Sequence, residues 1–257
     1  MNVAYHLAYS RKAAFLGDSD FPHSVHAFKE GMTLQLYQNL YERYSTLGLS
    51  YLTDRPRAIA GLEKRLMKAL GSSGGYGIFQ SKDENRDYFH RGLLWQRSGT
   101  TLKRIDFKSA DMVLSWSWMA FDGEIRYMNV PLGNIEKAED LVSPFERTEP
   151  GTLYTDLSPT KRAELRAPVR TLAVPKPSWL ILDEPESPDR PVARPLKCVI
   201  VGKSRKSTGN GDRTNYALIV SLLRIEGKVE IYERAGVAYL ATSEILPEQD
   251  KKYVRIR

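Results

Sequence analysis

Three apolar runs in the last third of the chain constrain its fold more than any other feature. The runs cover residues 196–202, 216–223 and 229–234, and the third alternates apolar with polar residues. Runs of this length, rich in Val, Ile and Tyr, are typical of β-strands. The two connections, residues 203–215 and a turn at Glu226-Gly227, are short for the helical crossover that parallel strands require. The sequence therefore predicts antiparallel strands near the C-terminus.

A second β signal lies in residues 113–127, which hold Trp116 and Trp118 ahead of the pair Asp122-Gly123. In a strand the two indoles would share one face. An Asp-Gly pair favours a tight hairpin turn, with residues 124–128 as the return strand. Two interpretations are open: the tryptophans anchor the core, or they form an aromatic platform for a ligand or a nucleic-acid base. No basic residue stands between them, which favours the core.

Two helices are predicted before this segment. The first covers residues 31–44, and the second opens at Thr53 or Asp54 as N-cap, with Pro56 in its first turn, and ends at Gly71. Apolar residues recur in the first helix at spacings of three and four: Leu34, Leu36, Tyr37, Leu40, Tyr41 and Tyr44. In the second helix the expected buried stripe is Ile59, Leu62, Leu66 and Leu70, and the residues expected to face outward are Glu63, Lys64, Arg65 and Lys68.

Three further segments are predicted to be loops without a site. Residues 71–77 are rich in glycine but follow a helix, whereas a dinucleotide-binding loop follows a strand, so a flexible connector is expected. Residues 202–204 lack the earlier glycine of a phosphate-binding loop, because Lys197 stands in its place. Asp183, Glu184 and Glu186 lie in a proline-rich stretch and are expected to be solvated rather than to act as paired carboxylates.

The composition bounds the class of protein. The chain of 257 residues has 42% hydrophobic residues, enough for a core, and a net charge of +7. Two basic clusters, around residues 203–213 and 251–257, do not alternate with aromatic residues, so a solvated loop and a frayed tail are expected and nucleic acid is not favoured as a partner. The single cysteine, Cys198, and the lack of a leader-like segment or a long apolar run predict a soluble cytoplasmic protein without a membrane contact.

The first thirty residues hold the histidines that a metal site would need. Three histidines lie there with two aspartates nearby: His6, His23, His26, Asp18 and Asp20. Gly17 and Pro22 indicate a loop, and the chain has no cysteine cluster, so no metal site is expected.

These signals predict an α+β fold, with an N-terminal helix pair packed on a mostly antiparallel β-sheet or sandwich. Residues 1–30 are expected to be irregular, and 31–134 to hold the helix pair and the Trp hairpin. Residues 135–195 are charged and rich in proline, which predicts a linker or insertion. Residues 196–257 are expected to be β-rich and to share one core with 31–134.

Five motifs occur in an order that resembles one protein family. They are Tyr44-Ser45 with Leu-Thr-Asp-Arg-Pro-Arg-Ala-Ile-Ala-Gly-Leu at 52–62, Arg-Gly-Leu-Leu-Trp at 91–95, Ser-Trp-Ser-Trp-Met-Ala-Phe-Asp-Gly at 115–123, Lys-Cys-Val-Ile-Val-Gly at 197–202, and Tyr-Glu-Arg-Ala-Gly-Val at 232–237. Over residues 30–257 the chain resembles the region that follows the HET domain in fungal heterokaryon-incompatibility proteins. The resemblance implies a link to self/non-self recognition and regulated cell death.

The HET domain itself is not recognisable. Its Ser-Tyr-x-Trp-Gly, Asp-x-x-Cys-Ile-x-Gln and Trp-Thr-x-Gln-Glu elements do not occur upstream of residue 30. The resemblance therefore implies a C-terminal piece of such a protein, either truncated or without the effector part.

The leading functional hypothesis is a non-catalytic accessory or regulatory module that works through protein contacts, since no nucleophile, base and metal ligands converge. No catalytic residue, metal or cofactor is expected. The alternative is a small-ligand or nucleotide-binding module, with one wall of its site formed by Trp95, Trp116, Trp118 and Arg97. A third hypothesis, a hydrolase using His90 with Asp87, has no identifiable nucleophile.

Overall fold

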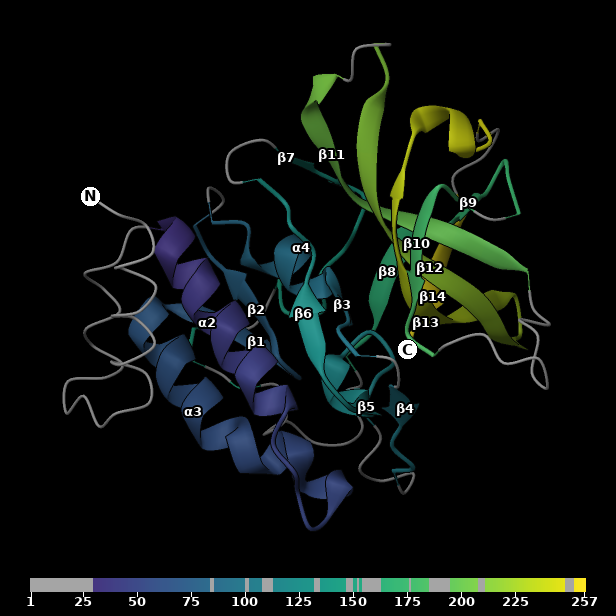
Figure 1. The fold of residues 1–257 in the computed structure, drawn as a ribbon. Helices are drawn as coiled ribbons and strands as arrows, with labels where there is room; N and C mark the ends of the chain where they lie inside the picture. The colour runs from purple at the N-terminus through teal and green to yellow at the C-terminus, as the bar shows by residue number, and fades with distance from the viewer. Residues whose placement is uncertain are drawn as a thin grey trace.

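The computed structural model describes residues 30–83, 86–99, 102–107, 113–131, 135–146, 150–151, 153, 163–175, 177–184, 195–207, 211–247 and 252–257. The irregular segment and the histidines expected within the first 29 residues lie outside these ranges. The fold is α+β, as predicted, with the helices on one side of the molecule and a large curled sheet on the other (Figure 1).

Both predicted helices are confirmed. α2 spans Glu30–Ser45 and α3 spans Arg55–Leu70, preceded by the 3-10 turn η2, Leu52–Asp54. Most of the apolar spacing is confirmed, because α2 buries Leu34, Leu36, Tyr37, Leu40 and Tyr41 and α3 buries Ile59, Leu66 and Leu70. Tyr44 and Leu62 are only half-buried. α3 ends at Gly71, which has a φ of 58° that suits glycine.

One expectation about α3 is wrong: Glu63 does not face outward but is fully buried, at 0% exposure. Burial of this side chain follows from where α3 packs, since it lies between α2 and the strand β1. The Tyr41 hydroxyl of α2 donates to Glu63 Oε1 at 2.8 Å, and the Tyr44 hydroxyl donates to the Arg55 carbonyl at 2.8 Å. These bonds join the two helices.

The predicted connector after α3 is instead a buried hairpin. β1, Ser72–Gly75, pairs antiparallel with β2, Ile78–Ser81, through a two-residue turn at Tyr76 and Gly77. Both turn residues have positive φ, 55° and 78°, as a type I′ turn requires. The glycines permit close packing, because a Cβ on Gly74 would lie 2.2 Å from the Ile78 carbonyl oxygen.

The predicted Trp hairpin is not formed. Residues 115–120 make turns, ending in the 3-10 turn η4, Trp118–Ala120, and the two strands beside Asp122-Gly123 pair with other partners. β5, Phe121–Asp122, pairs with β4, Lys103–Arg104, whereas β6, Ile125–Tyr127, pairs with β3, Trp95–Arg97. Gly123 still turns the chain, with a φ of 129°. Tertiary pairing thus overrode the local turn signal.

The helix pair contacts the small two-stranded sheets. α2 packs against β6, and α3 packs against β1, so the small two-stranded sheets separate the helix pair from the large sheet (Figure 1). A short helix, α4, spanning Tyr88–Leu93, contacts both β2 and the large sheet.

The C-terminal strands are confirmed and are longer than predicted. β11, Leu196–Ser207, β12, Arg213–Glu226, and β13, Val229–Leu240, form an antiparallel meander. The turn at Glu226-Gly227 is present, with a Gly227 φ of 63°. The residues 203–207 and 213–215, expected in a loop, continue β11 and β12, so the segment 202–204 lies inside a strand.

The C-terminal tail is a strand rather than a frayed end. β14, Tyr253–Ile256, lies parallel to β13 and antiparallel to β8, Leu165–Pro168, with Val254 and Ile256 buried. The basic residues of this segment alternate with the buried apolar ones, as in a strand with one buried face. The high content of basic residues had suggested a frayed tail instead. Arg257 pairs with Glu164 and, at 3.2 Å, with Glu226.

The described parts of residues 135–195 are not a linker, because they complete the large sheet. β7, Ile135–Lys137, and β9, Arg170–Thr171, pair with β11, whereas β10, Trp179–Leu182, pairs with β13. β8 and β9 follow one another, so one segment pairs with β14 at one margin of the meander and with β11 at the other. These strands are too short to show a period-two pattern, and nearby prolines indicated irregular structure, so the sequence did not predict them.

One apolar cluster spans both halves of the molecule. It includes Phe89, Leu93 and Trp116 from the first half, together with Val199, Leu218 and Val254 from the large sheet. A second cluster, centred on the helix pair, contains Tyr41, Leu66 and Trp118. The two clusters meet around residues 93–97 and 114–121.

Candidate functional site

The three tryptophans proposed as a ligand wall are fully buried. Trp95, Trp116 and Trp118 all have 0% exposure, which confirms the prediction that Trp116 and Trp118 belong to the core. The turn at residues 115–120 sends the latter two indoles apart: Trp116 lies in the cluster shared with the large sheet, and Trp118 in the helix cluster. The structure brings Trp95 and Trp116 together, since the Trp95 indole donates to the Trp116 carbonyl at 2.8 Å.

The face of the Trp95 ring is covered by an arginine that sequence analysis did not single out. The guanidinium carbon of Arg234, on β13, lies 3.3 Å from the ring centroid. A guanidinium so placed is held by the ring's electrons, and it excludes any ligand from this face. Trp95 is therefore part of an internal contact between β3 and the large sheet.

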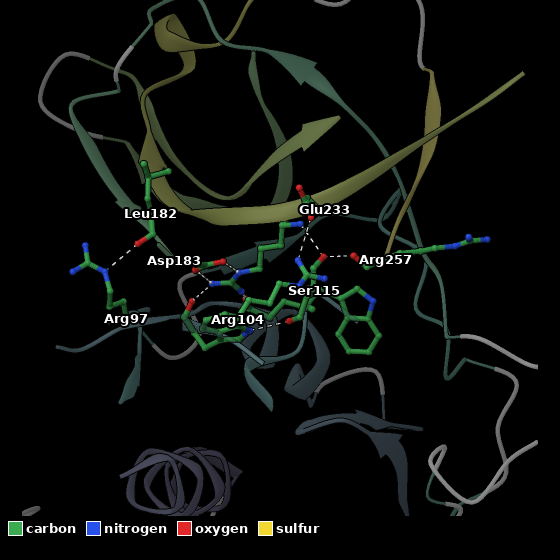
Figure 2. A network of polar contacts seen from close by, with 11 residues as sticks. Arg97, Arg104, Ser115, Leu182, Asp183, Glu233 and Arg257 are labelled. Carbon is green, nitrogen blue, oxygen red and sulfur yellow. Dashed lines mark hydrogen bonds and ion pairs between the residues drawn. The ribbon is translucent and has the colours of Figure 1, made fainter. Parts of the chain in front are cut away.

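Arg234 forms a buried ion pair with Asp183, the residue after β10 (Figure 2). Nε lies 2.9 Å from Oδ2, and a second guanidinium nitrogen lies 3.1 Å from Oδ1, so the contact is bidentate. The same guanidinium donates to the carbonyl of Leu93 at 2.7 Å and to that of Trp95. Burial raises the pKa of Asp183, and the charge of Arg234 opposes that rise. Such geometry provides the hydrogen bonds that a desolvated ion pair requires.

The expectation that Asp183 is solvated is therefore wrong, and a β-bulge explains why. In the β12–β13 ladder Ile219 faces Gly236 while Val220 faces Arg234, so Ala235 is the extra residue. A bulge changes the face to which a side chain points, so strand alternation cannot predict the direction of Arg234. The Ala235 carbonyl accepts from the Asp183 amide at 2.8 Å, which holds the carboxylate opposite the guanidinium. In the sequence, the one indication of this bulge is the Ala-Gly pair that follows Arg234 within a predicted strand region.

A serine extends this network to the end of the chain. The Ser115 hydroxyl accepts from the Arg234 backbone amide at 2.9 Å and donates to the Arg257 carbonyl (Figure 2). Ser115 is fully buried. The turn between residues 114 and 117 is thus tied to both β13 and the end of β14. We call the set Trp95, Ser115, Asp183 and Arg234 the joint.

Arg97 lies at the rim of the joint. Its Nε donates to the Leu182 carbonyl at 3.2 Å (Figure 2). Its Nη1 donates to the Gly99 carbonyl at 2.9 Å. Nearby, Arg104 pairs with Glu233 at 3.1 Å, with the Arg104 side chain 39% exposed. The rim therefore connects β3 and β4 to the large sheet through partly exposed polar contacts.

The His90–Asp87 pair lies between α4 and the segment after β7. Nδ1 of His90 lies 2.7 Å from Asp87 Oδ1, and Nε2 lies 3.3 Å from the Ala138 carbonyl. Both ring nitrogens thus contact protein atoms, and the pair fastens α4 to the segment after β7. The position matches a helix anchor rather than a base directed at a nucleophile.

A second buried carboxyl, that of Glu63, lies in the helix cluster. Its Oε1 accepts from the Tyr41 hydroxyl at 2.8 Å and from the Gly77 amide at 2.9 Å. Burial raises the pKa of Glu63 from 4.5 to about 7, although both hydrogen bonds act in the opposite direction. Sequence analysis missed this group because its position on α3 resembles that of its charged, exposed neighbours.

Metal and membrane signals are also absent where the structure can be described. Within the described ranges, no three His, Cys, Asp or Glu side chains are grouped so as to hold a metal ion. Among the described helices, none has the length and apolar character needed to cross a membrane. Comparison with known proteins found no matching family model, no matching curated protein and no matching solved structure.

Proposed function

We propose that this chain is a non-catalytic regulatory module that acts through contact with another protein in the cytoplasm. The proposal joins the motif resemblance to fungal heterokaryon-incompatibility proteins with one surface feature, the loop between α2 and α3. In that setting the module would modulate a HET-type signalling domain that takes part in self/non-self recognition and regulated cell death.

The observation that carries the proposal is the exposure of apolar side chains on this loop. Leu47, Tyr51 and Leu52 are 51%, 73% and 37% exposed, and they lie within six consecutive residues. Scattered apolar residues on a surface are ordinary, but a concentration with an aromatic member is typical of protein-binding sites. We call the connection between α2 and α3, residues 46–54, the apical loop.

The apical loop is held in shape by its own backbone. The Leu47 amide donates to the Tyr44 carbonyl at 3.0 Å, and the Asp54 amide donates to the Tyr51 carbonyl at 3.0 Å. An ordered loop loses less conformational entropy on binding than a floppy one. Tyrosine and leucine presented in this way therefore support recognition of a complementary apolar surface.

The interior supports contact rather than catalysis. The Arg234 guanidinium donates to Asp183 and to the carbonyls of Leu93 and Trp95, and His90 has a protein atom at each ring nitrogen. Groups held in this way stabilise the module and are not presented to a substrate. The cytoplasmic placement agrees with the single cysteine of the sequence, Cys198, which leaves no internal disulfide to form.

The experiment is to express the chain in a fungal host, fused to an intact HET domain, and to measure cell death. The wild-type module is expected to change the toxicity of that domain. The double variant Leu47→Ser/Tyr51→Ser is expected to remove this change, because it removes the apolar contact without affecting the core.

The matched control is Ile225→Ser/Tyr253→Ser, which alters two apolar residues of the large sheet that are 61% and 51% exposed. It should behave as wild type. If the apical-loop variant and the control have the same effect, or if the wild-type module leaves toxicity unchanged, the proposal is wrong.

A further inference from the structure

Glu63 is a buried acid placed among aromatic side chains. It has 0% exposure, and its cluster includes Tyr41, Phe79 and Trp118. The Oε1 atom accepts from both the Tyr41 hydroxyl and the Gly77 amide, while the buried Oε2 has no hydrogen-bond partner within the described part of the chain. A carboxylate in such a place would lack the solvation that an ion needs.

Among the residues that the structure describes, none places a compensating cation on Glu63. Tyr41 and Tyr44 face it from α2, and Tyr127 faces it from β6. Arg55, on the first turn of α3, instead pairs with Asp122 at 3.3 Å. The donors on Glu63 are thus a phenol and a backbone amide, both of them neutral.

The position of Gly77 makes the packing sensitive to this carboxyl. The Gly77 amide donates to Glu63, and a Cβ at Gly77 would lie 2.2 Å from the indole nitrogen of Trp118. Trp118 in turn contacts Tyr41, with ring centroids 5.2 Å apart. Glu63, the β1–β2 turn, Trp118 and α2 therefore meet at one point, where a movement of one displaces the others.

We propose that Glu63 is a proton-operated switch that holds α2, α3 and the β1–β2 turn together when protonated and loosens them when ionised. The neutral carboxyl fits the aromatic surroundings. The ionised one draws water toward Oε2 and pushes apart the elements that meet at Gly77. The switch acts independently of the protein contact proposed above.

The direction of the pH effect follows from proton linkage. Burial raises the pKa of Glu63 to about 7 in the folded chain, compared with 4.5 for an unperturbed glutamate. Between these values the folded state binds a proton that the unfolded state has released, so raising the pH favours unfolding. The stability contributed by the neutral carboxyl is complete below the lower value and is lost as the pH rises through the higher one.

The test is chemical unfolding of the full chain at a series of pH values from about 5 to about 8. Over the titration window, Glu63 should raise the unfolding equilibrium constant by up to about tenfold per pH unit. Glu63→Gln keeps an oxygen for Tyr41 and Gly77 but cannot ionise. The variant should lose this part of the slope and unfold less readily than wild type at the alkaline end.

The matched control is Glu136→Gln. The hydrogen bond from Arg213 lowers the pKa of Glu136, so this exposed group titrates below the window. The control should keep the wild-type slope. A Glu63→Gln protein with the wild-type slope would contradict the proposal.

A second measurement does not depend on the variant folding. In the wild-type chain, the NMR shift of the Gly77 amide should titrate with a midpoint near neutral pH, because its acceptor gains a charge. The midpoint reports the folded state directly. A Gly77 amide whose shift stays constant from about pH 5 to about pH 8 would refute the switch, whatever the variant does.

Discussion

The surroundings of Asp183 and those of Glu63 show two ways of burying a carboxyl group. Asp183 faces a guanidinium through two contacts of 2.9 and 3.1 Å, and Trp95 and Ser115 complete the joint around it. Glu63 has two neutral donors on one oxygen. The first arrangement pairs the carboxyl group with a cation and fixes the orientation of distant segments, whereas the second depends on a proton.

The difference also separates the roles of the two regions. The joint connects β3, the segment after β10, and β13, so a disturbance there affects how the first half is attached to the large sheet. The Glu63 cluster connects neighbouring elements within the first half. We therefore expect the joint to determine global stability and the Glu63 cluster to determine how tightly the helix pair is held.

The largest effect should follow from removing the cation of the joint. Arg234→Met leaves the Asp183 carboxylate buried without its partner, and the free energy of unfolding should fall by about 3–5 kcal/mol. Urea unfolding measures the loss. Arg234→Met combined with Asp183→Leu should recover much of it, because no uncompensated charge remains; a single variant as stable as wild type would show that the ion pair does not hold the joint.

A smaller effect should follow from adding a methyl group beside Glu63. Gly77→Ala places a Cβ 2.2 Å from the Trp118 indole nitrogen at a φ of 78°, so the free energy of unfolding should fall by about 2–4 kcal/mol. Thermal or urea unfolding tests this. The control Gly227→Ala has a similar φ of 63° but open space around it, and should lose only about 1–2 kcal/mol. Equal losses would mean that backbone conformation, not the close approach to Trp118, sets the effect.

The smallest effect is expected at the rim. Glu233→Gln removes the charge that pairs with Arg104 at 3.1 Å, where the two side chains are 39% and 22% exposed. Water screens such a pair, so the free energy of unfolding should change by less than about 1 kcal/mol, and less again in high salt. A loss comparable to that of Arg234→Met would place the main connection at the rim instead of in the joint.

Local patterns in the sequence predicted the parts of the fold that depend on local contacts. The spacing of Leu34, Tyr37 and Tyr41 predicted α2, and Pro56 and Gly71 marked the ends of α3. The meander followed in the same way, since β11, β12 and β13 are joined by short connections. In each case neighbours in sequence are neighbours in the structure.

The errors arose where pairing partners are distant in sequence. β6 pairs with β3 and β5 with β4, so the Asp122-Gly123 turn has no hairpin around it. Residues 135–195 contribute short strands whose partners lie beyond residue 195. Their own residues show no alternation of apolar and polar side chains from which a strand could be predicted.

The candidate site was predicted only in part, for the same reason. That Trp116 and Trp118 are buried could be inferred from their chemistry, but their divergence depends on the turn at 115–120. The burial of Asp183 depends on a bulge at Ala235 and on a partner that lies 51 residues away. Glu63 became visible only once α2 and the β1–β2 turn were placed around it.

The continuous segment made by β8 and β9 has a consequence for how this molecule meets others. Open sheet margins present unpaired backbone amides and carbonyls, to which a strand of another chain can add, and this is a common route to aggregation. Here residues 165–168 pair with β14, and residues 170–171 pair with β11. At these positions the sheet is therefore completed by a strand from its own chain. A partner that binds this protein is thereby directed away from backbone pairing at these positions and toward side-chain recognition.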